Sequence, residues 1–215
     1  MYILEGAIGA GKSTLLSLLK KHVPEIMVKK EPVAAWSDET QNSLLKKFYK
    51  DPVRWAYTFE KATLFERVKN HLDYQLTKES NLVVERSIYS GHYIFAKNSY
   101  EQNFLTELEW KMYQEWFDFL VGRCMTPKGF IYIKAQPEVS YSRIKKRARS
   151  GEEAISLEYL HQIYNKHEQL FASNNNYKLI KNIPVLTLDV DKDFEKNSFY
   201  TNQHVDTVKK FILSS

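Results

Sequence analysis

The chain has 215 residues, of which 43% are hydrophobic and 27% charged; this suits one compact globular domain and excludes an intrinsically disordered chain. No apolar run is long enough to cross a bilayer, and the single cysteine, Cys124, excludes a disulfide framework and favours a reducing compartment such as the cytoplasm. The formal net charge is +5 without an aromatic-interleaved basic groove, so we expect the positive charge to meet phosphate groups and not nucleic acid or a membrane.

Short apolar runs alternate with helical patterns along the chain. The apolar, largely β-branched runs predict strands at 2–4, 27–28, 81–84, 130–133 and 185–188. Apolar residues at helical spacing predict helices at 14–19, 44–49, 52–76, 105–119, 157–171 and 205–213, and Gln136-Pro137 opens another. Strands separated by helices indicate an α/β fold with a parallel sheet covered on both faces, in a single domain at 1–215.

A glycine-rich turn between the first strand and the first helix matches the pattern G-x-x-x-x-G-K-S/T at every fixed position. Glycines let backbone N–H groups converge on phosphate oxygens, and the helix N-terminus adds positive potential. The lysine reaches the outer phosphates of a nucleoside triphosphate, and the serine hydroxyl can ligate Mg²⁺. The residues that carry this prediction are Gly6, Ala7, Ile8, Gly9, Ala10, Gly11, Lys12, Ser13 and Thr14.

Acidic residues follow two of the predicted strands, at the carboxyl edge where parallel sheets bind their ligands. Glu31 comes after the second strand, where it can accept a proton from a substrate hydroxyl, and Trp36 can wall a ring-shaped pocket. After the third strand, Glu85 can hold Mg²⁺ and Arg86 can neutralise charge on a transferring phosphoryl group. The plainer alternatives are a surface charge beside a core tryptophan at the first place and a structural ion pair at the second.

The densest positive cluster of the chain runs from 143 to 149. Arg143, Arg147 and Arg149 recur at near-helical spacing, so at least two share a face, and such a segment can close over ATP as a lid at about 143–153. Glu152 would be carried into the site by the same closure. A solvated helix face is the commoner fate of such charge runs, and it stays open as the alternative.

Ordered motifs along nearly the whole chain resemble the deoxynucleoside kinase family, and the deoxycytidine and deoxyguanosine kinases most of all. Besides the glycine-rich turn, the matching segments are Glu31-Pro32-Val33 with Trp36, Arg54-Trp55-Ala56-Tyr57-Thr58-Phe59, Glu85-Arg86-Ser87-Ile88-Tyr89-Ser90, Tyr93-Ile94-Phe95-Ala96, Glu109-Trp110 and Leu157-Glu158-Tyr159-Leu160. The resemblance implies a P-loop kinase fold with a five-stranded parallel sheet flanked by helices, and a homodimer. It also implies transfer of the γ-phosphoryl group of ATP to the 5′-hydroxyl of a deoxynucleoside.

The same resemblance implies roles for individual residues. Glu31 would be the base on the 5′-hydroxyl, Arg86 would hold that hydroxyl and the phosphates, and Glu85 would organise Mg²⁺, although the choice of base between Glu31 and Glu85 stays open. Tyr49 and Glu152 would bind the sugar 3′-hydroxyl. The other implied contacts are Trp36, Phe59 and Phe95 around the base, the lid arginines Arg143, Arg147 and Arg149, and Lys192, Asp193 and Phe194 against the adenine of ATP.

Two positions depart from the family pattern. Glu60 stands where a glutamine normally pairs with the base, and Gly91 stands where an aspartate normally partners Arg67. An ionised glutamate offers only acceptors, which suits the N1–H and amino group of guanine, while an arginine suits guanine O6 and N7. We therefore expect deoxyguanosine to be favoured, with deoxycytidine or deoxyadenosine next. The alternative is an ion pair between Glu60 and Arg67 that says little about the base.

Two other functions stay open from the sequence. A deoxynucleoside monophosphate kinase would use the room at Gly91, with His92, for a phosphate on its substrate, although Glu31 would repel that phosphate. A nucleotide-sensing subunit would bind without turnover, but such a protein need not keep Lys12, Glu31 and Arg86 together.

Overall fold

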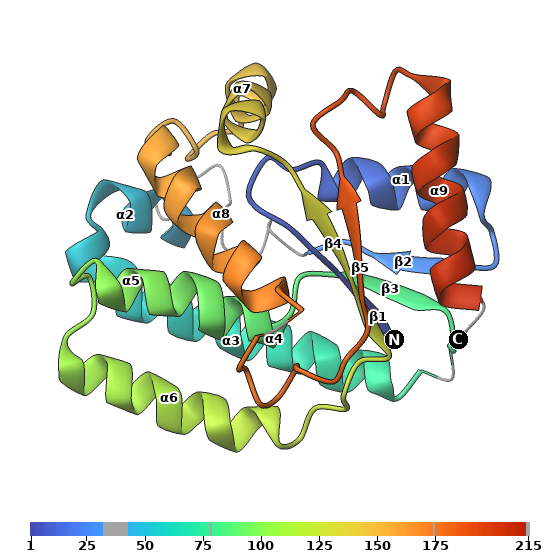
Figure 1. Cartoon of the computed structure of the whole chain (residues 1–215). Coiled ribbons are helices and arrows are strands. Elements are labelled where there is room, and N and C mark those ends of the chain that lie inside the picture. Colours follow the sequence, from blue (N-terminus) through green and yellow to red (C-terminus); the bar gives the residue numbers. More distant parts are fainter. Residues whose placement is uncertain (32–42, 78, 174, 214–215) are drawn as a thin grey trace.

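The computed structural model describes residues 1–31, 43–77, 79–173 and 175–213. At its centre is one sheet of five parallel strands in the order β2-β3-β1-β4-β5, which confirms the expected α/β class (Figure 1). The strands are β1 (Tyr2–Glu5), β2 (Met27–Lys29), β3 (Leu82–Glu85), β4 (Gly129–Lys134) and β5 (Val185–Asp189). Each lies within about one residue of its predicted position, because short apolar runs rich in β-branched residues and bounded by polar residues favour strands.

Helices cover both faces of the sheet (Figure 1). They are α1 (Lys12–His22), α2 (Leu44–Lys50), α3 (Pro52–Gln75), α4 (Ile88–Ser90), the π-helical segment η2 (Gly91–Ala96), α5 (Lys97–Glu101), α6 (Glu107–Val121), α7 (Pro137–Arg147), α8 (Leu157–Phe171) and α9 (Ser198–Leu213). None of the helices in the described part of the chain combines the length and apolar character needed to span a membrane.

The core lies in two layers because alternate side chains of each strand point to opposite faces. Tyr2 and Leu4 of β1 pack in one layer with the leucines of α1 and the valines of α9. Ile3, between them, packs in the other layer with side chains of α3, α6 and α8. The central strand is therefore buried on both faces, as expected for a parallel sheet.

Side-chain caps begin several of the helices that carry site residues. Asp51 accepts a hydrogen bond from the backbone N–H of Arg54 at 3.1 Å, and Pro52 opens α3 in the first turn. Ser156 accepts from the N–H of Tyr159 at 3.0 Å and begins α8. These caps fix where each helix starts, and so fix which of its side chains reach the carboxyl edge of the sheet.

The segment from α4 through η2 to α5 is continuously helical, although the sequence predicts no element there. Ser87 begins it, because its hydroxyl accepts hydrogen bonds from the N–H groups of Tyr89 and Ser90, both at 3.1 Å. The wider π turns at 91–96 shift the side-chain period away from 3.6 residues, so the pattern does not read as a regular helix. Helix α9 likewise begins at Ser198, well before the predicted start at 205.

Candidate active site

Two cavities lie at the carboxyl edge of the sheet and meet at the phosphate loop, residues 6–13. The inner cavity has a volume of about 360 Å³ and the outer cavity one of about 790 Å³. Five residues line both, namely Gly9, Lys12, Ser13, Glu85 and Arg147. A group bound in one cavity can therefore meet a group bound in the other at the phosphate loop.

Lys12 opens α1, and its side chain is buried beside the phosphate loop. Its Nζ donates hydrogen bonds to the carbonyl oxygens of Gly6 and Ala7, at 3.0 and 2.9 Å. Burial, followed by the charge of Arg86, lowers the pKa of Lys12. A phosphate anion would favour the charged ammonium and accept stronger hydrogen bonds than a carbonyl, so the loop suits an anionic ligand.

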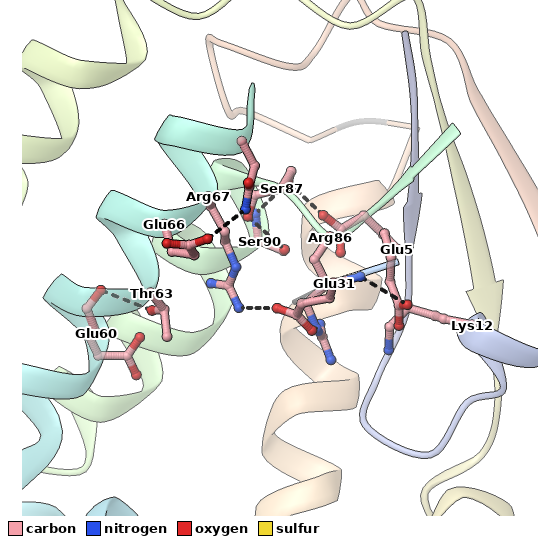
Figure 2. A network of polar contacts seen from close by, with 12 residues as sticks. Glu5, Lys12, Glu31, Glu60, Thr63, Glu66, Arg67, Arg86, Ser87 and Ser90 are labelled. Carbon is pink, nitrogen blue, oxygen red and sulfur yellow. Dashed lines mark hydrogen bonds and ion pairs between the residues drawn. The ribbon is translucent and has the colours of Figure 1, made fainter. Parts of the chain in front are cut away.

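Glu31 lies just beyond β2, and its carboxylate is held between two guanidinium groups (Figure 2). Oε1 accepts a hydrogen bond from Nη2 of Arg67 at 2.9 Å, and Oε2 accepts one from Nε of Arg86 at 3.2 Å. Burial favours the neutral acid, but the two arginines outweigh it and lower the pKa of Glu31. Glu31 is therefore an ionised carboxylate in the wall of the inner cavity, and not a surface charge.

Glu85, the last residue of β3, lies against Ser13 of the phosphate loop. The Ser13 hydroxyl is 3.3 and 3.2 Å from the two carboxylate oxygens, and the backbone N–H of Glu31 donates to Oε2 at 3.4 Å. Within the described ranges, no three His, Cys, Asp or Glu side chains gather into a metal-binding group. A hydroxyl and one carboxylate nevertheless fit Mg²⁺, which keeps several waters and takes phosphate oxygens as its other ligands.

Arg86 has a left-handed backbone, with φ of 67°, which is rare for a residue that has a side chain. Its N–H donates to the carbonyl of Leu4 at 2.9 Å, and the neighbouring Ser87 hydroxyl donates to the buried Glu5 at 2.6 Å. The guanidinium carbon lies 4.6 Å from the ring centroid of Phe95. These contacts from β1 and η2 hold Arg86 at the inner cavity, where it pairs with Glu31 and not with Glu85.

The arginines of the expected lid are tied into the site. Arg143 of α7 donates to the carbonyl of Ala10 at 3.2 Å and to that of Val190 at 2.7 Å. Glu152 accepts from Arg147 at 2.6 Å and from Arg149 at 3.3 Å. Helix α7 ends at Arg147, so Arg149 reaches Glu152 from the following turn. Lys145, Lys146 and Arg147 are exposed, so this part of the cluster also lies on a solvated helix face.

Glycines let the phosphate loop pack against its neighbours. Gly9 has φ of 81°, and a Cβ there would lie 2.5 Å from the carbonyl oxygen of Ser140 in α7. A Cβ on Gly11 would lie 3.0 Å from the ring of the buried Phe194. The close approach of α7 on one side and of Phe194 on the other forms walls of the outer cavity.

Of the residues expected beside the adenine of ATP, Asp193 and Phe194 line the outer cavity together with Gly11, Thr14 and Arg143. Lys192 is not among the described residues that line it, and its Nζ donates to the hydroxyl of Tyr200 at 2.8 Å. Ile8 lines the inner cavity, whereas Gly6, Ala7 and Ala10 contribute backbone carbonyls.

Aromatic rings enclose the inner cavity. Phe59 of α3 stacks on Phe48 of α2, with ring centroids 4.7 Å apart and planes at 11°. Tyr49 meets Tyr159 of α8 edge to face, with ring centroids 6.4 Å apart. Phe95 lines the same cavity, and the Arg86 guanidinium lies over its ring. Flat apolar walls of this kind suit a planar ring held by stacking.

Glu60 of α3 lies in the wall of the inner cavity and is only 2% exposed. Its Oε1 accepts a hydrogen bond from the Ser99 hydroxyl at 2.9 Å. Arg67, two turns farther along the same helix, pairs instead with Glu31, so the alternative ion pair between Glu60 and Arg67 does not form (Figure 2). Burial raises the pKa of Glu60 to about 7.

Gly91, the first residue of η2, opens onto Arg67 and not onto the inner cavity. A Cβ built there would lie 2.7 Å from Nη1 of Arg67, so the guanidinium already occupies the room left by the missing side chain. His92 is stacked on Phe117 with ring centroids 3.8 Å apart, away from the residues that line the cavity. Neither residue forms a second phosphate site in this arrangement.

Most expected substrate contacts meet in one place. Those that line the inner cavity are Glu31, Tyr49, Phe59, Glu60, Arg67, Arg86, Phe95 and Glu152. Trp36 lies outside the described residues. Sequence reasoning missed Phe48, Thr63 and Tyr159 as lining residues and Ser99 as the partner of Glu60. Thr63 follows Glu60 by three residues, so the helical spacing could have predicted that both lie on one face of the helix. No sequence pattern predicts the contact of Ser99 with Glu60, because that contact depends on the helix over 88–101, which the sequence does not predict.

Comparison with known proteins gives a consistent result. The family model for deoxynucleoside kinase matches residues 2–213. A "Deoxycytidine kinase 2" of Gallus gallus is 35% identical over 98% of this chain and 89% of its own length. A mitochondrial deoxyguanosine kinase of Xenopus laevis is 36% identical over 97% of this chain and 88% of its own length. A probable deoxycytidine kinase of fowlpox virus is 34% identical, over 97% of this chain and 86% of its own length.

The match covers the phosphate loop, the turn after β3 and the basic segment at 143–149 alike, and these three relatives are named as kinases. The expected resemblance and the expectation of an enzyme are therefore confirmed, and a binding-only protein is set aside. This chain belongs to the deoxynucleoside kinase family.

Proposed function

We propose that the chain transfers the γ-phosphoryl group of ATP to the 5′-hydroxyl of a deoxynucleoside, with the nucleoside in the inner cavity and ATP in the outer one. The observation that carries this proposal is the position of Glu31 and Lys12 in the wall of the same cavity. A carboxylate that can accept the hydroxyl proton thus lies near the lysine that holds the outer phosphates of the donor.

In this proposal Glu31 is the base and Glu85 is not. Glu31 is ionised, and it faces Arg86 and Arg67 in the nucleoside cavity. Arg86 holds the acceptor oxygen close to Glu31 and neutralises charge that moves onto the transferring group, while Lys12 binds the β- and γ-phosphates. The proton of the 5′-hydroxyl passes to Glu31 as the new P–O bond forms, and ADP leaves.

Mg²⁺ would be held by Ser13 and Glu85, which meet at the junction of the two cavities. When bound there, the ion would supply neutralisation of phosphate charge. Glu85 then has a role other than that of base, because its carboxylate is directed to the phosphate loop and not to Arg86.

Tyr49 and Glu152 bind the sugar 3′-hydroxyl in the proposal, and Phe59 and Phe95 enclose the base from two sides. Trp36 keeps its expected role in that wall, although it lies outside the described residues. The segment at about 143–153 acts as the lid, with Arg143, Arg147 and Arg149 around the phosphates; Asp193 and Phe194 lie against the adenine.

Deoxyguanosine is the proposed favoured substrate at mildly alkaline pH, with deoxycytidine or deoxyadenosine next. Support comes from Glu60, because an ionised carboxylate offers two acceptors to the N1–H and amino group of guanine. Arg67 gives less support than the sequence suggests, since its guanidinium is engaged by Glu31. A monophosphate acceptor has little support, because Gly91 opens onto Arg67 and not onto the cavity.

The chain is proposed to act as one domain over residues 1–215, as a homodimer in a reducing compartment such as the cytoplasm. Support for the homodimer is an exposed apolar patch on two helices that pack together, α3 and α6. Its members are Phe65, Leu108, Met112, Trp116 and Phe119.

A direct assay tests the proposed reaction. The four deoxynucleosides and their monophosphates are offered separately with ATP and Mg²⁺ at about pH 8, and kcat/KM is compared. We expect phosphorylation of the nucleosides and not of the monophosphates, with deoxyguanosine ahead by roughly tenfold, as one matched buried polar contact predicts. A higher kcat/KM for thymidine would refute the base preference, and a higher value for dGMP would refute the nucleoside as acceptor.

A further inference from the structure

The carboxyl group of Glu60 has two oxygens in different environments. Oε1 accepts the hydrogen bond from the Ser99 hydroxyl at 2.9 Å. Oε2 is buried and has no hydrogen-bond partner among the residues that the structure describes. A buried carboxylate oxygen without a donor is costly, whereas the same oxygen carrying a proton needs only an acceptor from a ligand.

The groups that face Glu60 allow its carboxyl group to gain or lose a proton near neutral pH. Arg67, on the same helix, is the guanidinium that acts on it, and this side chain is already paired with Glu31. Tyr49, Tyr113 and Tyr159 approach from α2, α6 and α8, and burial raises the pKa of each phenol, so that all three stay neutral. Ser99 contributes a hydroxyl from α5 and no charge.

We propose that the proton on Oε2 of Glu60 selects the nucleobase, so that the ionised carboxylate takes deoxyguanosine and the neutral acid takes deoxycytidine. The inference rests on the proposed function, because it places the base of the nucleoside in the inner cavity. It goes further by making the ranking of substrates depend on one proton, which a glutamine at this position could not do.

Each form of the side chain matches a different base edge. The ionised carboxylate presents two acceptors, which pair with the N1–H and amino group of guanine. The neutral acid presents an O–H donor beside a carbonyl acceptor, which pairs with N3 and the amino group of cytosine. If guanine binds the neutral acid, its N1–H donor faces the O–H donor of Glu60. If cytosine binds the carboxylate, its N3 acceptor faces a negatively charged oxygen. Each of these pairings leaves a polar group without a matching partner.

Burial raises the pKa of Glu60, against the opposing effects of Ser99 and Arg67, to about 7. The neutral acid therefore predominates below that pH and the carboxylate above it. The Ser99 hydroxyl donates to Oε1 in both forms, which holds the carboxyl plane fixed while Oε2 gains or loses its proton. The change in substrate ranking is thus expected within the pH range in which the enzyme can be assayed.

A competition assay tests the proposal. The wild-type enzyme and Glu60→Gln are each given equal deoxycytidine and deoxyguanosine with ATP and Mg²⁺, and the ratio of the two monophosphate products is followed from about pH 6 to about pH 8.5. Both substrates share one tube and one active site, so pH effects on Lys12, Glu31 or ATP cancel in the ratio. Glutamine has the shape of the neutral acid but does not titrate.

For the wild type we expect the ratio of deoxycytidine to deoxyguanosine product to fall about tenfold or more as the pH rises, as a mismatch of 1–3 kcal/mol predicts. For Glu60→Gln we expect one ratio at every pH, close to the wild-type value at the acid end. A wild-type ratio that does not change with pH, or a slope that persists in Glu60→Gln, overturns the proposal.

Two further measurements keep the test decisive if Glu60→Gln is inactive. In Ser99→Ala, loss of the donor disfavours the carboxylate, so the change of ratio is expected at higher pH than in the wild type; an unmoved midpoint contradicts the assigned role of Ser99.

The melting temperature detects protonation of Glu60 even in a variant that has no kinase activity. The folded protein binds this proton more tightly than the unfolded chain does. As the pH rises from about 4.5 to about 7, the melting temperature of the wild type should therefore fall relative to that of Glu60→Gln.

The outcomes also separate this inference from the proposed reaction. If both nucleosides are phosphorylated with a constant ratio, the proposed transfer stands and only the proton-dependent selection fails. If neither nucleoside is phosphorylated at any pH while dGMP is, the proposed acceptor fails first, and the inference fails with it.

Discussion

At Glu31 and Glu85, two carboxylates near one another are distinguished by the cations and donors that each one meets. Glu31 is paired with Arg67 and Arg86, whereas Glu85 accepts from Ser13 at the phosphate loop. Both follow strands and both are acidic, so residue type alone could not divide the proposed roles of base and metal ligand between them. Arg86 has a left-handed backbone, and its guanidinium pairs with Glu31 and not with its sequence neighbour Glu85.

The two roles give different responses to the same kind of substitution. In Glu31→Gln the acceptor for the hydroxyl proton is lost, so kcat should fall by roughly 10²- to 10⁴-fold with an unchanged Mg²⁺ requirement. In Glu85→Gln one charged oxygen ligand is lost, so the Mg²⁺ concentration for half-maximal rate should rise. Steady-state rates across a Mg²⁺ titration measure both, with Glu66→Gln on α3 as a control that should keep wild-type rates. The assignment would be reversed if Glu31→Gln shifted the Mg²⁺ requirement and Glu85→Gln did not.

Among the elements, α7 packs closely against the phosphate loop because the loop has a glycine at the point of contact. Gly9 lies so close to α7 that any Cβ would meet the carbonyl oxygen of Ser140, and its φ of 81° is unfavourable for other residues. Arg143 adds hydrogen bonds from α7 to Ala10 and Val190. The position of α7 and the shape of the phosphate loop therefore depend on each other.

The substitution Gly9→Ala should push α7 away from the phosphate loop. We expect the free energy of unfolding to fall by about 1–3 kcal/mol and the KM for ATP to rise, because α7 must move outward to admit the methyl group. Gly122→Ala is the matched control, since a Cβ there would lie 3.8 Å from its nearest neighbour, the carbonyl oxygen of Asp118. Thermal melting and ATP titration of both variants check the prediction; equal behaviour of the two would contradict the proposed packing.

The elements also show where sequence reasoning succeeds and where it stops. Runs such as the one in β3 are apolar, short and bounded by polar residues, and their strand character is local. The helix over 88–101 is different, because the π turns at 91–96 have no regular apolar spacing. With that helix unseen, neither the contact of Ser99 with Glu60 nor the contact of Gly91 with Arg67 could be predicted.

At the scale of the whole molecule, the motifs predicted that phosphate loop, carboxylates and lid would converge, and they do line adjoining cavities. The partners within that site were less predictable. Arg67 was expected beside Glu60 or a base, yet it binds Glu31, which lies 36 residues away in sequence. Such choices among nearby charges are decided by side-chain directions in the folded protein, and a sequence pattern does not contain them.

The proposed assembly of two chains belongs to the scale of the whole molecule, and the exposed apolar patch on α3 and α6 supports it. Trp116 and Phe65 meet at 5.8 Å between centroids on α6 and α3, and both remain about two-fifths exposed. We expect Trp116→Glu to convert a homodimer to monomers, since a charge would be buried in the interface without a partner. Light scattering after size-exclusion chromatography measures the mass, and Phe199→Glu on α9 is the control for an exposed apolar side chain elsewhere. A mass unchanged by Trp116→Glu would exclude this patch.

The parallel sheet has a consequence for how the protein is made. Tyr2 of β1 pairs with Val83 of β3 on one side and with Gly129 of β4 on the other, so both partners of β1 are synthesised much later than β1 itself. Pairings so distant in sequence are slow to close. During translation, the loop that holds Lys12 would gain its neighbouring strands only after the segments around Val83 and Gly129 have emerged.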